Sequence, residues 1–168
     1  MTISMYQSSV AVFIRQLENL SAILKKSEAH AEAKKIDPTV LLSARLFPDM
    51  LPLTRQIQIA CDAVKFGAGR LAEVEMPVFE DVEKSFPELC ERITKTIKFL
   101  QTIKPEQIDE KEALKITYTQ RNKENNFIGQ PYLLNYVLPN LYFHISIAYA
   151  ILRHNGVEIG KKDYLGNL

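Results

Sequence analysis

The residues of this chain that could coordinate a metal or attack a substrate are three histidines and two cysteines. Cys61 and Cys90 both fall within helical patterns, and no C-x-x-C or Cys…His spacing of a zinc site is present. Such cysteines are usually small core residues, so we expect neither a disulfide nor a reactive thiol. No serine–histidine–acid, paired-carboxylate or H-E-x-x-H motif occurs either. The sequence therefore contains no recognisable set of catalytic residues.

The three histidines occupy different settings. His30 lies in the charged, alanine-rich stretch KKSEAHAEAKK, where a solvated side chain is expected. Arg153 and His154 end the last helical pattern, where basic groups complement the helix dipole; alternatively, they bind the C-terminal tail or an anionic group. His144 lies inside a long apolar run. It could serve as a hydrogen-bonded core residue, a polar group in a ligand pocket or a metal ligand.

The run that contains His144 organises the rest of the chain. Residues 125–152 include no charged side chain, and 133–152 are apolar on nearly every side of a helix. A helix of this kind is buried in a core, in an oligomer interface or in lipid. Burying the polar side chains of Asn135, Asn140 and His144 in lipid would cost free energy. The other, amphipathic helices of the chain also need a fourth helix to cover their apolar faces. We therefore expect the core of a helical bundle and no membrane span.

Three other stretches carry apolar residues at helical spacing, and they cover roughly 4–26, 49–71 and 85–104. Asp49 is the expected N-cap of the second helix, with Pro52 in its first turn. Ser85 and Glu88 form a capping box at the start of the third. These stretches and the apolar run predict four helices.

A short β-hairpin is predicted before the last helix. Leu114, Ile116 and Tyr118 alternate with polar residues, 122–126 supply turn residues, and 127–128 form a short return strand. The last helix should begin near Tyr132 and either kink at Pro139 or start anew after it. The predicted fold is all-α: one domain over 1–168, an up-down-up-down four-helix bundle with this hairpin inserted.

Composition excludes several classes of partner. The 168 residues are 46% hydrophobic and carry a net charge of +1, which gives no electrostatic reason to expect nucleic acid or an anionic membrane. The N-terminal residues lack the charged region and cleavage site of a signal peptide, so a cytoplasmic location is expected.

Residues 45–62 and 138–166, and more weakly 77–89, resemble the DinB-like (YfiT-like) superfamily of four-helix-bundle, metal-dependent proteins. The closer resemblance is to a branch defined by a domain of unknown function. The resemblance implies the bundle fold over the whole chain. Relatives in the superfamily include metal-dependent thiol transferases, but the branch supplies no activity to carry over.

The resemblance to the superfamily implies a metal site made of one histidine from the second helix and two histidines four residues apart on the last helix. The matching ILRHNG ending places His144 on the second of the last two positions and Asn140 on the first. The second helix has no histidine; its polar candidates are Gln56, Gln58 and Asp62. Zinc and nickel favour imidazole or thiolate ligands. We therefore expect no metal cofactor, with His144 as the weak candidate ligand if a divalent transition metal does bind.

The functional hypothesis is a small-molecule pocket between helices with a degraded metal triad. Its candidate residues are Gln56, Asn140, Tyr142, His144, Arg153 and Tyr164. Tyr142 has packing as its alternative role, and the segment with Tyr164 is expected to fold back over the end of the bundle. The alternatives are a non-enzymatic homo-oligomeric interaction protein and a metal-dependent enzyme similar to the thiol transferases.

A homodimer is expected because the last helix has more apolar surface than a bundle core requires. Phe143, Ile147, Ala150 and Ile151 lie outside the main stripe from Leu138 to Leu152. The hairpin or the tail after Gly156 could cover them. If they do not, a two-fold contact between copies is the common solution.

Overall fold

The computed structural model describes residues 3–120 and 122–166. Its helices and strands, in chain order, are α1 (Met5–Ser8), α2 (Val10–Lys34), α3 (Pro38–Ser43), α4 (Leu53–Ala72), α5 (Phe86–Thr102), α6 (Pro105–Ile108), β1 (Lys115–Gln120), β2 (Lys123–Ile128), α7 (Gly129–Tyr132), the π-helical turn η1 (Leu133–Val137), α8 (Leu138–His154) and α9 (Lys161–Leu165). No helix in these described ranges is both long and apolar enough to cross a membrane.

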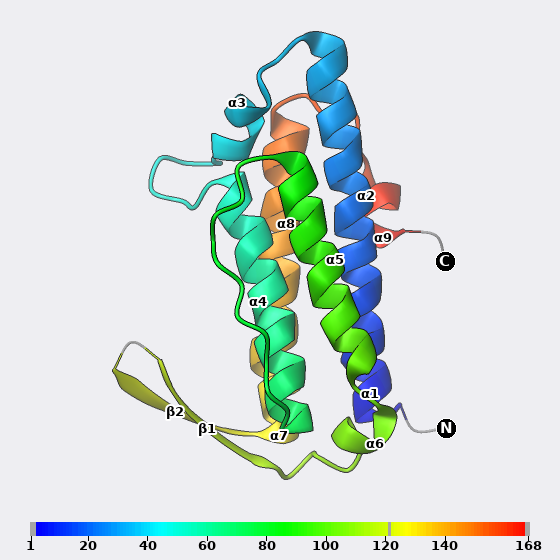
Figure 1. Ribbon diagram of the computed structural model, residues 1–168, viewed down its shortest axis with the longest axis vertical. Helices are drawn as coiled ribbons and strands as arrows, with labels where there is room; N and C mark the ends of the chain where they lie inside the picture. The colour runs from blue at the N-terminus through cyan, green and yellow to red at the C-terminus, as the bar shows by residue number, and fades with distance from the viewer. Residues whose placement is uncertain (1–2, 121, 167–168) are drawn as a thin grey trace.

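Four long helices, α2, α4, α5 and α8, stand side by side and form the bundle (Figure 1). The helix α4 packs on α8 and α5, and α2 packs on α5. The apolar stripes of the sequence face inward, so Phe13, Leu17, Ile57, Ile93 and Ile145 are buried together in one core. The predicted all-α four-helix bundle with a hairpin before the last helix is confirmed.

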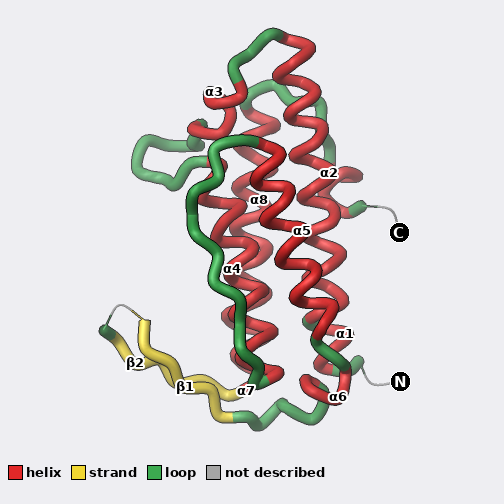
Figure 2. The backbone as a smooth tube through the Cα atoms, viewed as in Figure 1, coloured by secondary structure: helices red, strands yellow, loops and turns green. Residues whose placement is uncertain are grey.

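The four helices run up, down, down and up, rather than in strict alternation. Two contacts show that α4 and α5 are parallel: Arg92 bonds to Asp62, and a Cβ at Gly69 would lie 3.5 Å from the ring of Phe99. Residues 73–85 make this possible because they return along the bundle as an extended strap before α5 begins (Figures 1 and 2). The difference from the predicted order arises in this connection.

The helix ends follow local signals with one correction. Ser85 and Glu88 form the predicted capping box, in which the serine hydroxyl accepts from the Glu88 amide. Asp49 was the expected N-cap of the second helix, but α4 begins at Leu53 with Pro52 in the N-cap position. The loop before it closes a turn at Met50, and Arg45 donates to the Met50 carbonyl, so the chain has not yet entered the helix at Asp49.

The hairpin leads directly into the last helix. The strands β1 and β2 are antiparallel, with Lys115 opposite Ile128 and Gln120 opposite Lys123. Pro139 falls in the first turn of α8, immediately after η1. A π-helical turn changes the hydrogen-bonding pattern locally. The proline is therefore accommodated where that pattern already changes, and α8 begins at Leu138.

The C-terminal segment folds back, and α9 lies against α2. Lys26 pairs with Asp163 at 2.5 Å, and the Asn19 amide donates to the Tyr164 carbonyl at 3.1 Å. The segment therefore covers part of the side of the bundle.

Candidate functional site

His144 and Gln56 face each other across the α4–α8 contact. The Nδ1 atom of His144 lies 2.7 Å from Oε1 of Gln56, and Gln56 Nε2 donates to the Leu51 carbonyl at 3.0 Å. Because that carbonyl can only accept, the amide oxygen must face the imidazole. Nδ1 of His144 therefore carries the proton and donates to Gln56.

Burial favours the neutral form of this histidine. Gln56 is 2% exposed and His144 is 9% exposed. Desolvation lowers the pKa of His144 below its ordinary value. The ring is consequently neutral at pH 7, with a lone pair left on Nε2.

The residues at the triad positions do not fit a transition-metal site. Asn140 donates its amide to the Tyr136 carbonyl at 2.7 Å, and Gln56 is committed to His144 and Leu51. One imidazole beside two amides lacks the nitrogen and sulfur ligands that zinc and nickel favour. In the ranges 3–120 and 122–166, no three His, Cys, Asp or Glu side chains converge as a possible metal site.

A pocket of about 250 Å³ lies between α4 and the η1–α8 helix, next to the His144–Gln56 pair. Its apolar wall consists of Ile59, Ala63, Phe66 and Val137. Its polar wall consists of Arg55, Asp62, Arg70, Gln120, Tyr132, Tyr136 and Asn140. Asn140 is one helical turn before His144, and Ile59 is one turn after Gln56. The pocket therefore lies one helical turn away from the His144–Gln56 pair along both helices.

Gly67 permits the close contact that closes the pocket. A Cβ at Gly67 would lie 2.4 Å from Cγ1 of Val137, closer than real carbon atoms approach. The absence of a side chain lets η1 approach α4, which brings Tyr132 and Tyr136 to the same side of the bundle as Phe66.

Arg70, in the last turn of α4, is held within aromatic side chains at one end of the pocket. Its guanidinium carbon lies 3.5 Å from the ring centre of Tyr118 and 5.1 Å from that of Phe66. Its Nη1 donates to the Tyr132 hydroxyl at 2.9 Å. Phe127, Tyr132 and Tyr136 pack on one another, with ring centres 5.1–5.7 Å apart. The hairpin is thereby attached to the bundle beside the pocket.

Comparisons with known proteins agree with this architecture. The family model described as "Domain of unknown function (DUF1993)" matches residues 5–165. This chain belongs to the DUF1993 family. A crystal structure of a DinB family member protein from Shewanella denitrificans shares 43% sequence identity with this DUF1993 protein and superposes with a TM-score of 0.89. The match covers 97% of the present chain and 92% of the Shewanella chain. The DUF1993 protein is therefore also a member of the DinB family. No curated protein matches it.

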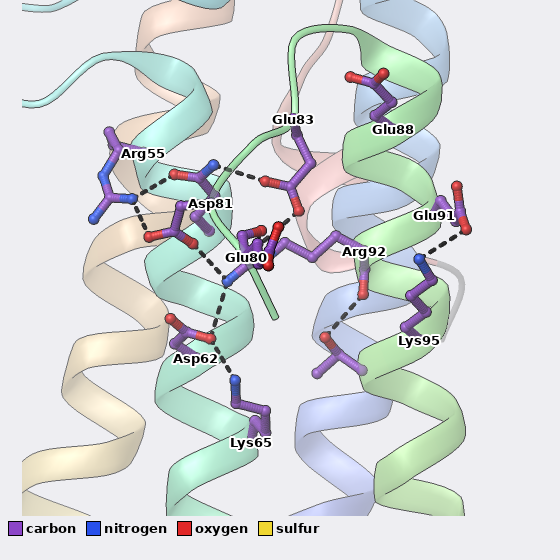
Figure 3. A network of polar contacts seen from close by, with 12 residues as sticks. Arg55, Asp62, Lys65, Glu80, Asp81, Glu83, Glu88, Glu91, Arg92 and Lys95 are labelled. Atoms are coloured by element: carbon purple, nitrogen blue, oxygen red, sulfur yellow. Dashed lines mark hydrogen bonds and ion pairs between the residues drawn. The ribbon is translucent and has the colours of Figure 1, made fainter. Parts of the chain in front are cut away.

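A second polar cluster of the DUF1993 protein lies where α4 meets α5 and the strap (Figure 3), and two of its residues, Arg55 and Asp62, also line the pocket. Arg92, on α5, is 2% exposed and reaches three carboxylates: Asp62 and Asp81 at 3.0 Å and Glu83 at 2.9 Å. Arg55 also pairs with Asp81, and Lys65 pairs with Asp62 at 2.9 Å. We call these six residues the Arg92 network.

The Arg92 network holds the strap to the bundle. Partial burial would raise the pKa of Asp81, but bonds and charge from Arg55 and Arg92 outweigh it and hold that pKa below its ordinary value. The pKa of Glu83 is likewise lowered, because bonds from Arg92 and Gln58 outweigh its desolvation. Both carboxylates belong to the strap, so their charge fixes it against α4 and α5.

The predicted site residues divide into two groups. Gln56 and His144 pair at the α4–α8 contact but do not line the pocket, whereas Asn140 does. Tyr164 lies on another side of α8, where its hydroxyl is 3.1 Å from Ser146 Oγ and its ring packs edge-on against Tyr149. Tyr142 is 38% exposed, and Arg153 is exposed near the C-terminal end of α8; neither lines the pocket.

Arg70 and the tyrosines around it were absent from the sequence-based candidates. One signal was present: Tyr132 and Tyr136 are four residues apart and share a helix face. Nothing local indicated that Arg70 or Tyr118 would join them, since these side chains come from α4 and β1.

Proposed function

We propose that the DUF1993 protein binds a small organic molecule in the pocket between α4 and the η1–α8 helix, without a metal at the former triad positions. The observation that supports this is the pocket itself, about 250 Å³ with one apolar wall and one polar wall. Ligand sites generally combine an apolar lining with a few converging polar groups. The volume lies just below the usual range of ligand pockets, about 300–1,000 Å³, so we expect a small ligand.

The chemistry of the triad positions argues against a metal-dependent thiol-transferase function. Such an enzyme needs a metal ion to activate the thiol. Here His144 is the sole imidazole at those positions, and the amides of Gln56 and Asn140 are already hydrogen-bonded. The proposal is therefore a binding function with no assigned reaction.

A fragment screen tests the pocket. We expect small apolar and aromatic fragments to shift the NMR signals of Ala63, Phe66 and Val137, all of which line it. Ala63→Leu should fill the space and abolish these shifts. Ala33→Leu, which adds the same side chain at an exposed site on α2, is the matched control and should preserve them. Fragments that bind elsewhere, or that bind equally well to Ala63→Leu, would contradict the proposal.

Elemental analysis of protein purified without an affinity tag tests the metal-free form. We expect far less than one equivalent of zinc, nickel or iron. One equivalent of any of these metals, lost in His144→Ala, would restore the metalloenzyme interpretation.

A homo-oligomeric interaction protein remains the second candidate, supported by the exposed apolar side chains of the last helix. Phe143 is 55% exposed and Leu134 is 46% exposed. The other part of the predicted surplus is covered, because Ile151 is buried and Ile147 packs against the core. A dimer contact would therefore involve Phe143 rather than Ile151.

A further inference from the structure

We propose that the ligand of this pocket is a monocarboxylate with a short aromatic or aliphatic body, and that Arg70 binds its carboxylate. This inference rests on the proposed function, because it names the ligand class of the same pocket. It depends on three observations: the charges of the pocket lining, the orientation of Arg70 and the apolar wall beside it.

Only three residues of the pocket lining carry a charge, and two of these are already compensated. Arg55 is paired with Asp81, and Asp62 is paired with Lys65 and Arg92. Arg70 has no carboxylate within ion-pair distance anywhere in residues 3–120 and 122–166; its contacts are Tyr132, Phe66 and Tyr118. One uncompensated positive charge therefore lines the pocket.

The surroundings of Arg70 orient it for planar recognition. The rings of Phe66 and Tyr118 contact its guanidinium, and Tyr132 accepts one hydrogen bond from it. Guanidinium has five N–H donors, and four of those of Arg70 have no hydrogen-bond partner among the described residues. Its flat fork matches the two oxygens of a carboxylate, and a guanidinium that is already positioned loses less entropy on binding.

The remainder of the lining selects the body of the ligand. Ile59, Ala63 and Val137 present aliphatic surface, and Tyr136, 37% exposed, presents an aromatic face. A phosphate dianion would call for a second uncompensated cation, whereas Arg70 supplies a single charge that suits a monoanion.

Arg70 also has a structural role that the test must separate from recognition. It lies in the last turn of α4, where a cation complements the helix dipole, and its ring contacts help to hold the hairpin. Loss of that role would weaken the binding of charged and neutral ligands alike. Loss of a carboxylate contact would weaken only the binding of the acid.

The test compares hydrocinnamate with hydrocinnamamide, which have nearly the same shape and differ in charge. By NMR titration we expect the wild-type protein to bind the acid about tenfold more tightly than the amide, a difference of about 1.4 kcal/mol. Arg70→Gln should make the two affinities equal, and Arg70→Lys should restore part of the preference. The control Arg153→Gln removes an exposed arginine outside the pocket and should retain the full preference.

Several outcomes would overturn the inference. These are equal affinity of the wild-type protein for acid and amide, no binding of the acid at millimolar concentration, tighter binding of inorganic phosphate than of hydrocinnamate, or an unchanged preference in folded Arg70→Gln. If Arg70→Gln does not fold, the wild-type comparison still decides. The fragment screen with Ala63→Leu judges the proposed function separately, because neutral fragments can bind the pocket even if no acid is preferred.

Discussion

Two clusters along α4 use charged residues in opposite ways. Where α4 meets α5 and the strap, Arg92 reaches three carboxylates, and Asp81 and Asp62 each have a second cation, although Asp62 also lines the pocket. On the side that faces η1 and α8, Arg70 is surrounded by aromatic rings and has no acidic partner among the described residues. A charged side chain that already has ion-pair partners stabilises the fold, whereas an oriented charged side chain without an ion-pair partner is available to a ligand.

The difference follows from the cost of burying ions. A buried guanidinium is tolerated only where carboxylates and hydrogen bonds replace its lost hydration. Arg92 meets that condition through Nη1 and Nη2, while its Nε–H is buried without a partner among the described residues, and it attaches the strap that makes α4 and α5 parallel. Arg70 is only partly buried and keeps some access to water, so it can remain without a carboxylate until a ligand supplies one.

The largest expected effect comes from removing the centre of the Arg92 network. Arg92→Met should lower the free energy of unfolding by about 3–5 kcal/mol, because Asp62, Asp81 and Glu83 lose a shared buried partner. Urea denaturation measures it. The matched control is Lys95→Met on the same helix, whose exposed pair with Glu91 should be worth at most about 1 kcal/mol. If the two substitutions lowered the free energy of unfolding equally, the Arg92 network would stabilise the fold no more than an exposed ion pair does.

Gln56→Leu should have the next largest effect. It leaves the Nδ1–H of His144 buried without an acceptor, which should lower the free energy of unfolding by about 1–3 kcal/mol. The double variant Gln56→Leu with His144→Leu removes both polar groups and should recover part of the loss. If the single variant is as stable as wild type, the His144–Gln56 hydrogen bond does not stabilise the α4–α8 contact beside the pocket.

Acid should destabilise the strap side of α4 through its carboxylates. The pKa values of Asp81 and Glu83 are lower in the folded protein than in the unfolded chain. The unfolded state therefore binds more protons as the pH falls, so stability is fully present above the ordinary carboxyl pKa of about 4 and declines below it. Urea midpoints between pH 6 and pH 3 measure the decline, which should be shallower in Arg92→Met. Parallel pH profiles for the two proteins would contradict this linkage.

The smallest effect on stability is expected at Phe143, which faces neither the network nor the pocket. Phe143→Glu should change the free energy of unfolding by no more than about 0.5 kcal/mol, because the side chain is 55% exposed. Its effect should appear in assembly instead. Light scattering should show a dimer for wild type at tens of micromolar and a monomer for the variant. A wild-type monomer at that concentration would exclude the homodimer.

The features determined by the sequence alone are those that depend on neighbours a few residues apart. Ser85 and Glu88 predicted their own capping box, and the alternation at Leu114, Ile116 and Tyr118 predicted the first strand of the hairpin. The predicted turn at 122–126 was wrong, because residues 123–126 already belong to β2 and pair with β1. The apolar stripes predicted the four helices and the buried faces of the first three. On the last helix, Ile151 was placed outside the buried stripe but is buried, and Tyr142 was placed in it but is exposed. The absence of a histidine from 49–71 led to the expectation of a poor metal site, which stays a prediction.

The tertiary structure alone decided the direction of α5 and the composition of the pocket. Both depend on contacts between residues distant in the chain: Arg92 with the strap carboxylates and Asp62, and Arg70 with Tyr118 and Tyr132. Helical periodicity shows which face of a helix is buried, but the same face is buried whether the helix runs up or down. It cannot show which distant charge will find a partner and which will remain uncompensated beside a cavity.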